Sequence, residues 1–100
     1  MKNVFAVRAK VTLWPGAVAA WHFVVLPEKQ SAEIKKRFGA KARGWGSLPV
    51  KVTLSKTKWA TSIFWDNRST AYLLPLKLKV RQAEGVAHGD TIKFNLEIKP

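Results

Sequence analysis

The sequence predicts a small, mainly β domain in which six strands and two short helices form a pseudo-barrel. Apolar and polar residues alternate with a period of two in six segments of the chain, which is typical of half-buried strands. The order strand, strand, helix, strand occurs twice, over roughly residues 4–55 and 58–98. Six strands close into one barrel more readily than two separate three-stranded sheets stand alone. We therefore expect a single domain over residues 1–100, built from two ββαβ halves related by a pseudo-twofold axis.

The first half begins with a strand over residues 5–13, followed by a turn at 14–16 and a second strand over 21–25. Pro27 ends this strand, because proline cannot donate to the ladder. The pattern then changes to an amphipathic helix over residues 28–38, and Gly39 is placed to stop it. A glycine-rich loop over residues 39–47 leads to a third strand over 50–54.

The second half continues with a strand over residues 58–65, a hairpin connection at 66–69 and a short strand over 70–74. Residues 76–84 are ambiguous between helix and strand, because residues 76–81 alternate as a strand would. Their flanks favour a short helix, because Pro75 suits the first helical position and Gly85 the C-terminal stop. The last strand covers residues 92–98.

A family resemblance agrees with this order of elements. Residues 80–92, with Arg81 ahead of Gly89-Asp90, resemble the helix–Gly-Asp–strand element of AbrB/MazE-type swapped-hairpin proteins. Over nearly its full length the chain is similar to an uncharacterised bacterial and archaeal domain-of-unknown-function family, sometimes attached to YdeI/OmpD-associated domains. The matching segments are 20–24, 26–27, 59–64, 72–77, 80–81 and 89–90.

The resemblance implies an AbrB-like double-split β-barrel capped at its ends by the two helices. In AbrB-like proteins each of two chains gives half a barrel, whereas a duplicated chain would supply both halves. The resembled family has no established activity, and it offers no catalytic residues to carry over.

The composition excludes several classes of protein. The chain has 18 Lys plus Arg against six Asp plus Glu, for a formal net charge of +12. Hydrophobic residues make up 47% of it and five are Trp, too much apolar mass for a disordered basic tail. The absence of Cys excludes a disulfide scaffold, a thiol nucleophile and a Cys-ligated metal. We expect a mature, cytoplasmic domain without membrane contact, because Arg8 and Lys10 interrupt the N-terminal apolar stretch.

The positive charge is concentrated in the middle of the chain. Nine basic residues and one acidic residue, Glu33, lie between Lys29 and Lys58. Phosphate backbones bind such surfaces, and a loop tryptophan beside an arginine can stack on a base. The candidate nucleic-acid-binding residues are Lys35, Lys36, Arg37, Lys41, Arg43 and Trp45. In the alternative interpretation these cations only solvate outward faces, and Trp45 folds back into the core.

Other candidate sites favour structural interpretations. Gly89-Asp90 is typical of a turn whose carboxylate accepts backbone hydrogen bonds, in preference to a catalytic pair with His88. His22 lacks the further ligands that a metal site needs. The aromatic side chains fill a six-stranded barrel in preference to lining a ligand cavity. No nucleophile elbow, P-loop or dinucleotide fingerprint is present, so we expect no enzyme and no cofactor.

Two functions remain open for a domain of this kind. The first is a small, non-catalytic basic domain that binds nucleic acid or another polyanion, such as an acidic protein. The alternative is a protein-interaction or small-ligand-binding accessory module. A duplicated barrel within one chain favours a monomer, whereas a long uncapped edge strand would favour a dimer.

Overall fold

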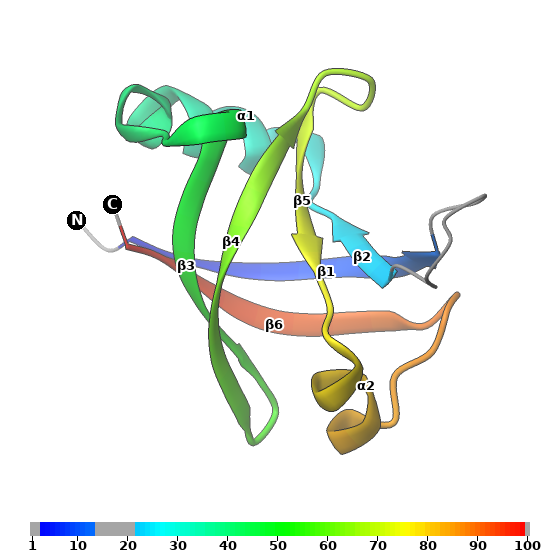
Figure 1. The fold of residues 1–100 in the computed structure, drawn as a ribbon. Coiled ribbons are helices and arrows are strands. Elements are labelled where there is room, and N and C mark those ends of the chain that lie inside the picture. The colour runs from blue at the N-terminus through cyan, green and yellow to red at the C-terminus, as the bar shows by residue number, and fades with distance from the viewer. Residues whose placement is uncertain (1–2, 14–21, 100) are drawn as a thin grey trace.

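Six antiparallel strands close into a barrel in the order β1-β2-β5-β4-β3-β6, with two α-helices outside it (Figure 1). The computed structural model describes residues 3–13 and 22–99, apart from the side chain of Trp45. The strands are β1 (Val4–Leu13), β2 (His22–Val25), β3 (Ser47–Leu54), β4 (Thr57–Asp66), β5 (Ala71–Pro75) and β6 (Thr91–Ile98). The mainly β prediction with two helices is thereby confirmed. The turn predicted at residues 14–16 and the start of the second strand at residue 21 lie outside the described residues.

The period-two pattern of the sequence places the core inside the barrel. On β6, Ile92, Phe94, Leu96 and Ile98 are buried, whereas Lys93 and Asn95 between them are exposed. The same alternation buries one face of β1 and of β3. These inward side chains form one continuous hydrophobic cluster, which holds the six strands together.

The two helices lie at opposite ends of the barrel (Figure 1). Helix α1 (Glu28–Phe38) buries Ser31, Ile34 and Phe38, and α2 (Leu78–Glu84) buries Val80. The start of β1 and the end of β6 lie together on one side of the barrel, where the Ile98 N–H donates to the Asn3 carbonyl oxygen at 2.8 Å.

At one end of each helix the structure differs in one detail from the sequence prediction. Helix α1 ends at Phe38 with Gly39 as its C-cap, as predicted, but Gly39 has right-handed dihedral angles. The 3₁₀ turn η1 (Gly39–Lys41) therefore follows directly, and a second 3₁₀ turn, η2 (Gly44–Gly46), comes after two extended residues. Pro75 is the last residue of β5 and pairs with Phe23, so its predicted place at the first position of the helix is wrong. The next backbone donor, Leu76 N–H, still bonds to β2, at the His22 carbonyl. Gly85 ends α2 in the left-handed conformation, as predicted, with φ 63°.

Candidate functional site

The predicted cationic residues lie at the C-terminal end of α1 and in the two 3₁₀ turns that follow it. We call residues 35–45 the basic segment. Lys35, Lys36 and Arg37 form the last turn of α1, where positive charge interacts favourably with the helix dipole. The positive charge of these three residues therefore stabilises the helix, independently of any ligand that they bind.

Lys35 is held over an aromatic ring from a distant strand. Its Nζ atom lies 3.8 Å from the centroid of the Trp65 ring on β4, a cation–π arrangement. The Trp65 ring is itself fixed, because its Nε1–H donates to Asn67 Oδ1 at 2.9 Å. It also meets the Tyr72 ring edge to face, with centroids 5.1 Å apart. Burial raises the pKa of the Tyr72 hydroxyl above its ordinary value of 10.0.

A cavity of about 410 Å³ lies beside this aromatic contact. Its lining residues are Glu28, Ala32, Lys35, Lys36, Trp65 and Thr70. Trp65 is therefore the aromatic side chain that the fold adds to the basic segment, and it was not among the predicted site residues. Its strand position gave no local signal for this role, because only the packing of α1 near β4 brings it to Lys35. The side chain of the predicted Trp45 lies outside what the structure describes.

Arg37 is engaged with its own surroundings. Its Nη1 atom forms an ion pair with Glu33 Oε2 one turn earlier, at 3.1 Å. The guanidinium carbon also lies 5.0 Å from the Phe38 ring centroid and 5.6 Å from that of Phe5. This side chain thus joins α1 to the start of β1, and any phosphate would have to compete with those contacts.

Lys36, Lys41 and Arg43 are the most available cations of the basic segment. All three are exposed, and none forms an ion pair with the residues that the structure describes. The backbone of Arg43 is fixed, because its N–H donates to the Ser47 carbonyl at 2.8 Å. The side chain is therefore presented from an anchored turn.

His88 and Asp90, the possible catalytic pair, both accept hydrogen bonds from the backbone. The Leu13 N–H donates to His88 Nδ1 at 3.0 Å, and the Ala87 N–H donates to Asp90 Oδ2 at 2.8 Å. Gly89 has φ 93°, so the predicted Gly-Asp turn is confirmed.

The described residues contain neither a metal-binding cluster nor a membrane-spanning helix. Over residues 3–13 and 22–99, no three His, Cys, Asp or Glu side chains are grouped so that they could hold a metal ion. In the same part of the chain, no helix is long and apolar enough to cross a membrane.

A family model described as "Domain of unknown function (DUF1905)" matches residues 8–96 of the chain. No curated protein matches it.

Proposed function

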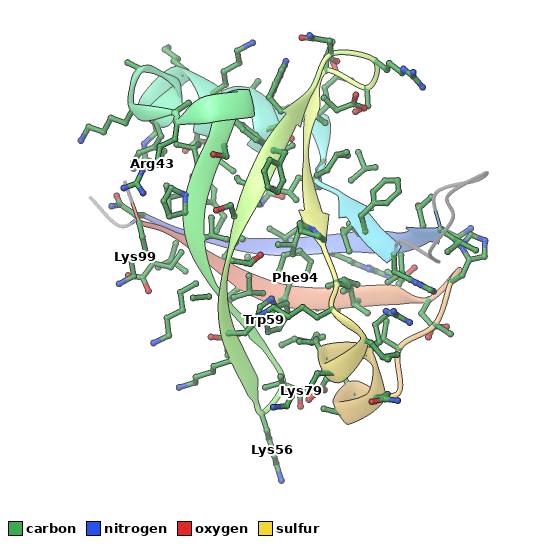
Figure 2. The ribbon with its side chains drawn as sticks, in the orientation of Figure 1. Arg43, Lys56, Trp59, Lys79, Phe94 and Lys99 are labelled. Carbon is green, nitrogen blue, oxygen red and sulfur yellow. The ribbon has the colours of Figure 1, made fainter. Side chains whose placement is uncertain are left out.

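This chain belongs to the DUF1905 family of domains of unknown function, and we propose that it is a non-catalytic module whose basic segment binds nucleic acid or another polyanion. The observation that carries the proposal is the surplus of unpaired positive charge. Of the basic residues that the structure describes, only Arg37 and Lys99 form ion pairs. Lys56 is one of the described basic residues without an ion pair, and it projects from the tip of the β3–β4 hairpin (Figure 2). Such a surface binds phosphate chains by releasing their counterions.

The basic segment is the best local candidate because it combines cations with an aromatic ring. Lys36, Lys41 and Arg43 are exposed, and the Trp65 ring lies at the cavity that Lys35 and Lys36 line. Stacking of a base on an aromatic ring beside cations is a common way to hold a single strand. Trp45 is proposed as an adjunct from its sequence position between two glycines.

The proposed architecture is the AbrB-like double-split barrel, made from the halves β1-β2-α1-β3 and β4-β5-α2-β6. Exchanging the halves leaves the strand order unchanged, which supports it. The registers agree with the exchange, because Leu13↔His22 between β1 and β2 corresponds to Trp65↔Tyr72 between β4 and β5. The duplication over roughly 4–55 and 58–98 is proposed on this ground, within a single domain.

Two backbone hydrogen bonds support the same exchange. The Leu26 N–H donates to the Tyr72 carbonyl, and the Leu76 N–H donates to the His22 carbonyl, both at 2.9 Å. In this correspondence Leu26 matches Leu76. The repeated Leu-Pro pair in the sequence would instead match Leu26 with Leu74. The correspondence is thus carried by strand register and not by the Leu-Pro pair.

We propose that the module works as a cytoplasmic monomer, without a cofactor. A closed barrel presents no open sheet edge for pairing with a second chain, which favours a monomer. The hydrogen bonds of His88 Nδ1 and Asp90 Oδ2 to backbone donors favour a structural role for both residues over catalysis.

A salt-dependent gel-shift series tests the proposal. Contacts with about 4–6 phosphates give a log–log slope of binding against salt of about −4 to −5 on duplex DNA. The double variant Lys36→Glu/Arg43→Glu should lower affinity and flatten the slope. Lys77→Glu/Lys79→Glu changes the same charge at the other helix and serves as the control. No binding to DNA or RNA at low salt, or equal losses in both variants, would contradict the proposal.

The small-ligand alternative is favoured by one observation. A cavity of about 300 Å³ lies between β4 and α2, where Trp59 and Lys79 are brought together from the two elements (Figure 2). Val80 and Ala83 add apolar lining. Thermal stabilisation by a neutral metabolite, independent of salt, would support this alternative over polyanion binding.

A further inference from the structure

Two cations face each other directly on the outer surface of the barrel. Arg8 of β1 is paired with Lys93 of β6, and both side chains are exposed. Like charges directly opposite each other destabilise an antiparallel pair. Neither residue forms an ion pair with the described residues. The half-buried carboxylate of β6, Glu97, forms an ion pair with Lys99 at 3.2 Å.

The barrel does not require this opposition, because a comparable strand pair avoids it. On β1 and β6, the pair Arg8↔Lys93 follows the inward pair Val7↔Phe94. The comparable position on β4 and β3 is the pair Ala60↔Lys51, which follows Trp59↔Val52. In the second case the lysine faces alanine. On its other side Lys51 pairs with Glu97, so its charge has an acidic neighbour.

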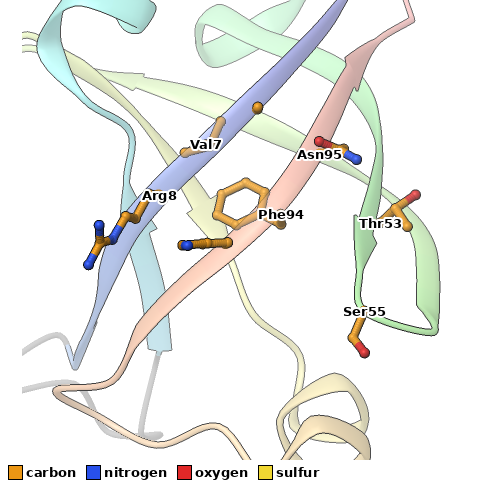
Figure 3. Close-up of a pocket in the computed structure, with 8 residues that line it drawn as sticks. Val7, Arg8, Thr53, Ser55, Phe94 and Asn95 are labelled. Carbon is orange, nitrogen blue, oxygen red and sulfur yellow. The ribbon is translucent and has the colours of Figure 1, made fainter.

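A groove of about 430 Å³ runs beside the opposed cations. Its polar lining consists of Arg8, Lys93, Asn95, Thr53 and Ser55, and no carboxylate lines it. Figure 3 shows Arg8 on one side of the groove and Thr53 and Ser55 on the other, with Asn95 on β6 between the strands. The groove thus has a cationic side and a side of neutral hydrogen-bonding groups.

We propose that this groove binds a phosphorylated organic molecule. The phosphate lies against Arg8 and Lys93, because guanidinium and ammonium groups form strong charge-assisted hydrogen bonds with phosphate oxygens. Its hydroxyl-bearing body lies toward Asn95, Thr53 and Ser55, which both donate and accept hydrogen bonds. Binding of the phosphate anion offsets the repulsion between the two cations.

The site is separate from the basic segment and does not rest on its proposed function. The groove and the basic segment share no lining residue. Variants of Lys36 and Arg43 should therefore leave groove binding unchanged, and variants of Arg8 and Lys93 test the groove alone.

The first test uses ribose 5-phosphate as the probe and ribose as its neutral counterpart, in calorimetric titrations. Ribose 5-phosphate should bind, and ribose should not. Arg8→Ala and Lys93→Ala should each weaken binding about tenfold or more, as expected for loss of a charged hydrogen bond. Lys51→Ala removes a lysine at the comparable register position and should change affinity less than about twofold.

A second measurement separates this proposal from a general loss of fold. Without ligand, Lys93→Ala should melt at a higher temperature than the parent protein, because it removes the opposed charge. The proposal is overturned if ribose and its phosphate bind equally, if Lys51→Ala weakens binding as much as Lys93→Ala, or if Lys93→Ala lowers the unliganded melting temperature.

The source of the phosphate is settled by competition. The competitor is a short single-stranded oligonucleotide without a terminal phosphate. If it displaces ribose 5-phosphate and loses affinity in the Arg8→Ala variant, the ligand is a nucleic-acid phosphodiester. Failure to displace it identifies a free phosphate monoester. Absence of binding by both probes contradicts the site.

Discussion

The ammonium group of Lys35 lies 3.8 Å from the centroid of the Trp65 ring, although the two residues belong to different elements, α1 and β4. This contact fixes the position of one predicted phosphate-binding lysine before any ligand arrives. It also places an indole ring at the edge of the basic segment.

Replacing Lys35 by methionine should therefore destabilise the protein slightly. The substitution keeps an apolar stem and removes the charge, so the expected loss is about 0.5–1 kcal/mol for an exposed cation–π contact. Denaturant unfolding measures it, with Lys36→Met as the neighbouring control. A double-mutant cycle with Trp65→Leu should return a coupling of similar size, and additive effects would contradict the contact.

Ser31 makes a stronger prediction, because it is the buried polar residue of the described core. Its hydroxyl donates to the Leu26 carbonyl oxygen at 3.4 Å and accepts the Tyr72 N–H at 3.1 Å, which ties α1 to β5 and to the residue that follows β2. Ser31→Ala leaves the Tyr72 donor unpaired and should lower the free energy of unfolding by about 1–3 kcal/mol. Thermal melting measures the loss. Ser62→Ala on β4 is the control, and equal effects of the two substitutions would argue against the buried bond.

Trp59 and Trp65 should respond differently to the same substitution. The Trp59 Nε1–H is buried without an acceptor among the described residues, whereas that of Trp65 donates to Asn67. Trp→Phe removes a useful hydrogen bond only at Trp65, and at Trp59 it removes a desolvated donor. Trp65→Phe should therefore destabilise the protein more than Trp59→Phe in denaturant unfolding. The reverse order would show that ring volume at Trp59 outweighs its unpaired donor.

Tyr72 gives a prediction on pH dependence that needs no substitution. It is the chain's single tyrosine, so tyrosinate absorbance reports on it alone. Burial raises its pKa, so the folded protein should titrate above 10.0 and the denatured chain near that value. Between the two pKa values the unfolded state releases the proton first, so stability is fully present below pH 10.0 and falls as the pH rises above it. Titration of the folded protein at or below 10.0 would contradict the burial of this hydroxyl.

The amino-acid sequence alone is enough to predict which side chains of each strand face inward. The alternation in β6 correctly separates Ile92, Phe94 and Leu96 from the exposed Lys93 and Asn95, because the pleat reverses the side-chain direction at each residue. The sequence also predicts that Gly85 ends α2 in the left-handed conformation, since that conformation favours a residue without Cβ. These are local properties, and they need no knowledge of the rest of the chain.

Which outward-facing residues meet depends on how the strands pair in three dimensions. Alternation assigns Arg8 and Lys93 to the surface, but their direct opposition depends on β1 pairing with β6 in one register. Likewise, the place of Lys35 over Trp65 depends on the packing of α1 near β4. Partner strands and registers are set by the burial of side chains far apart in sequence, and a period-two pattern carries no information about them. The charge of +12 follows from the sequence, and the groove that concentrates two of its cations follows from the closure of the barrel.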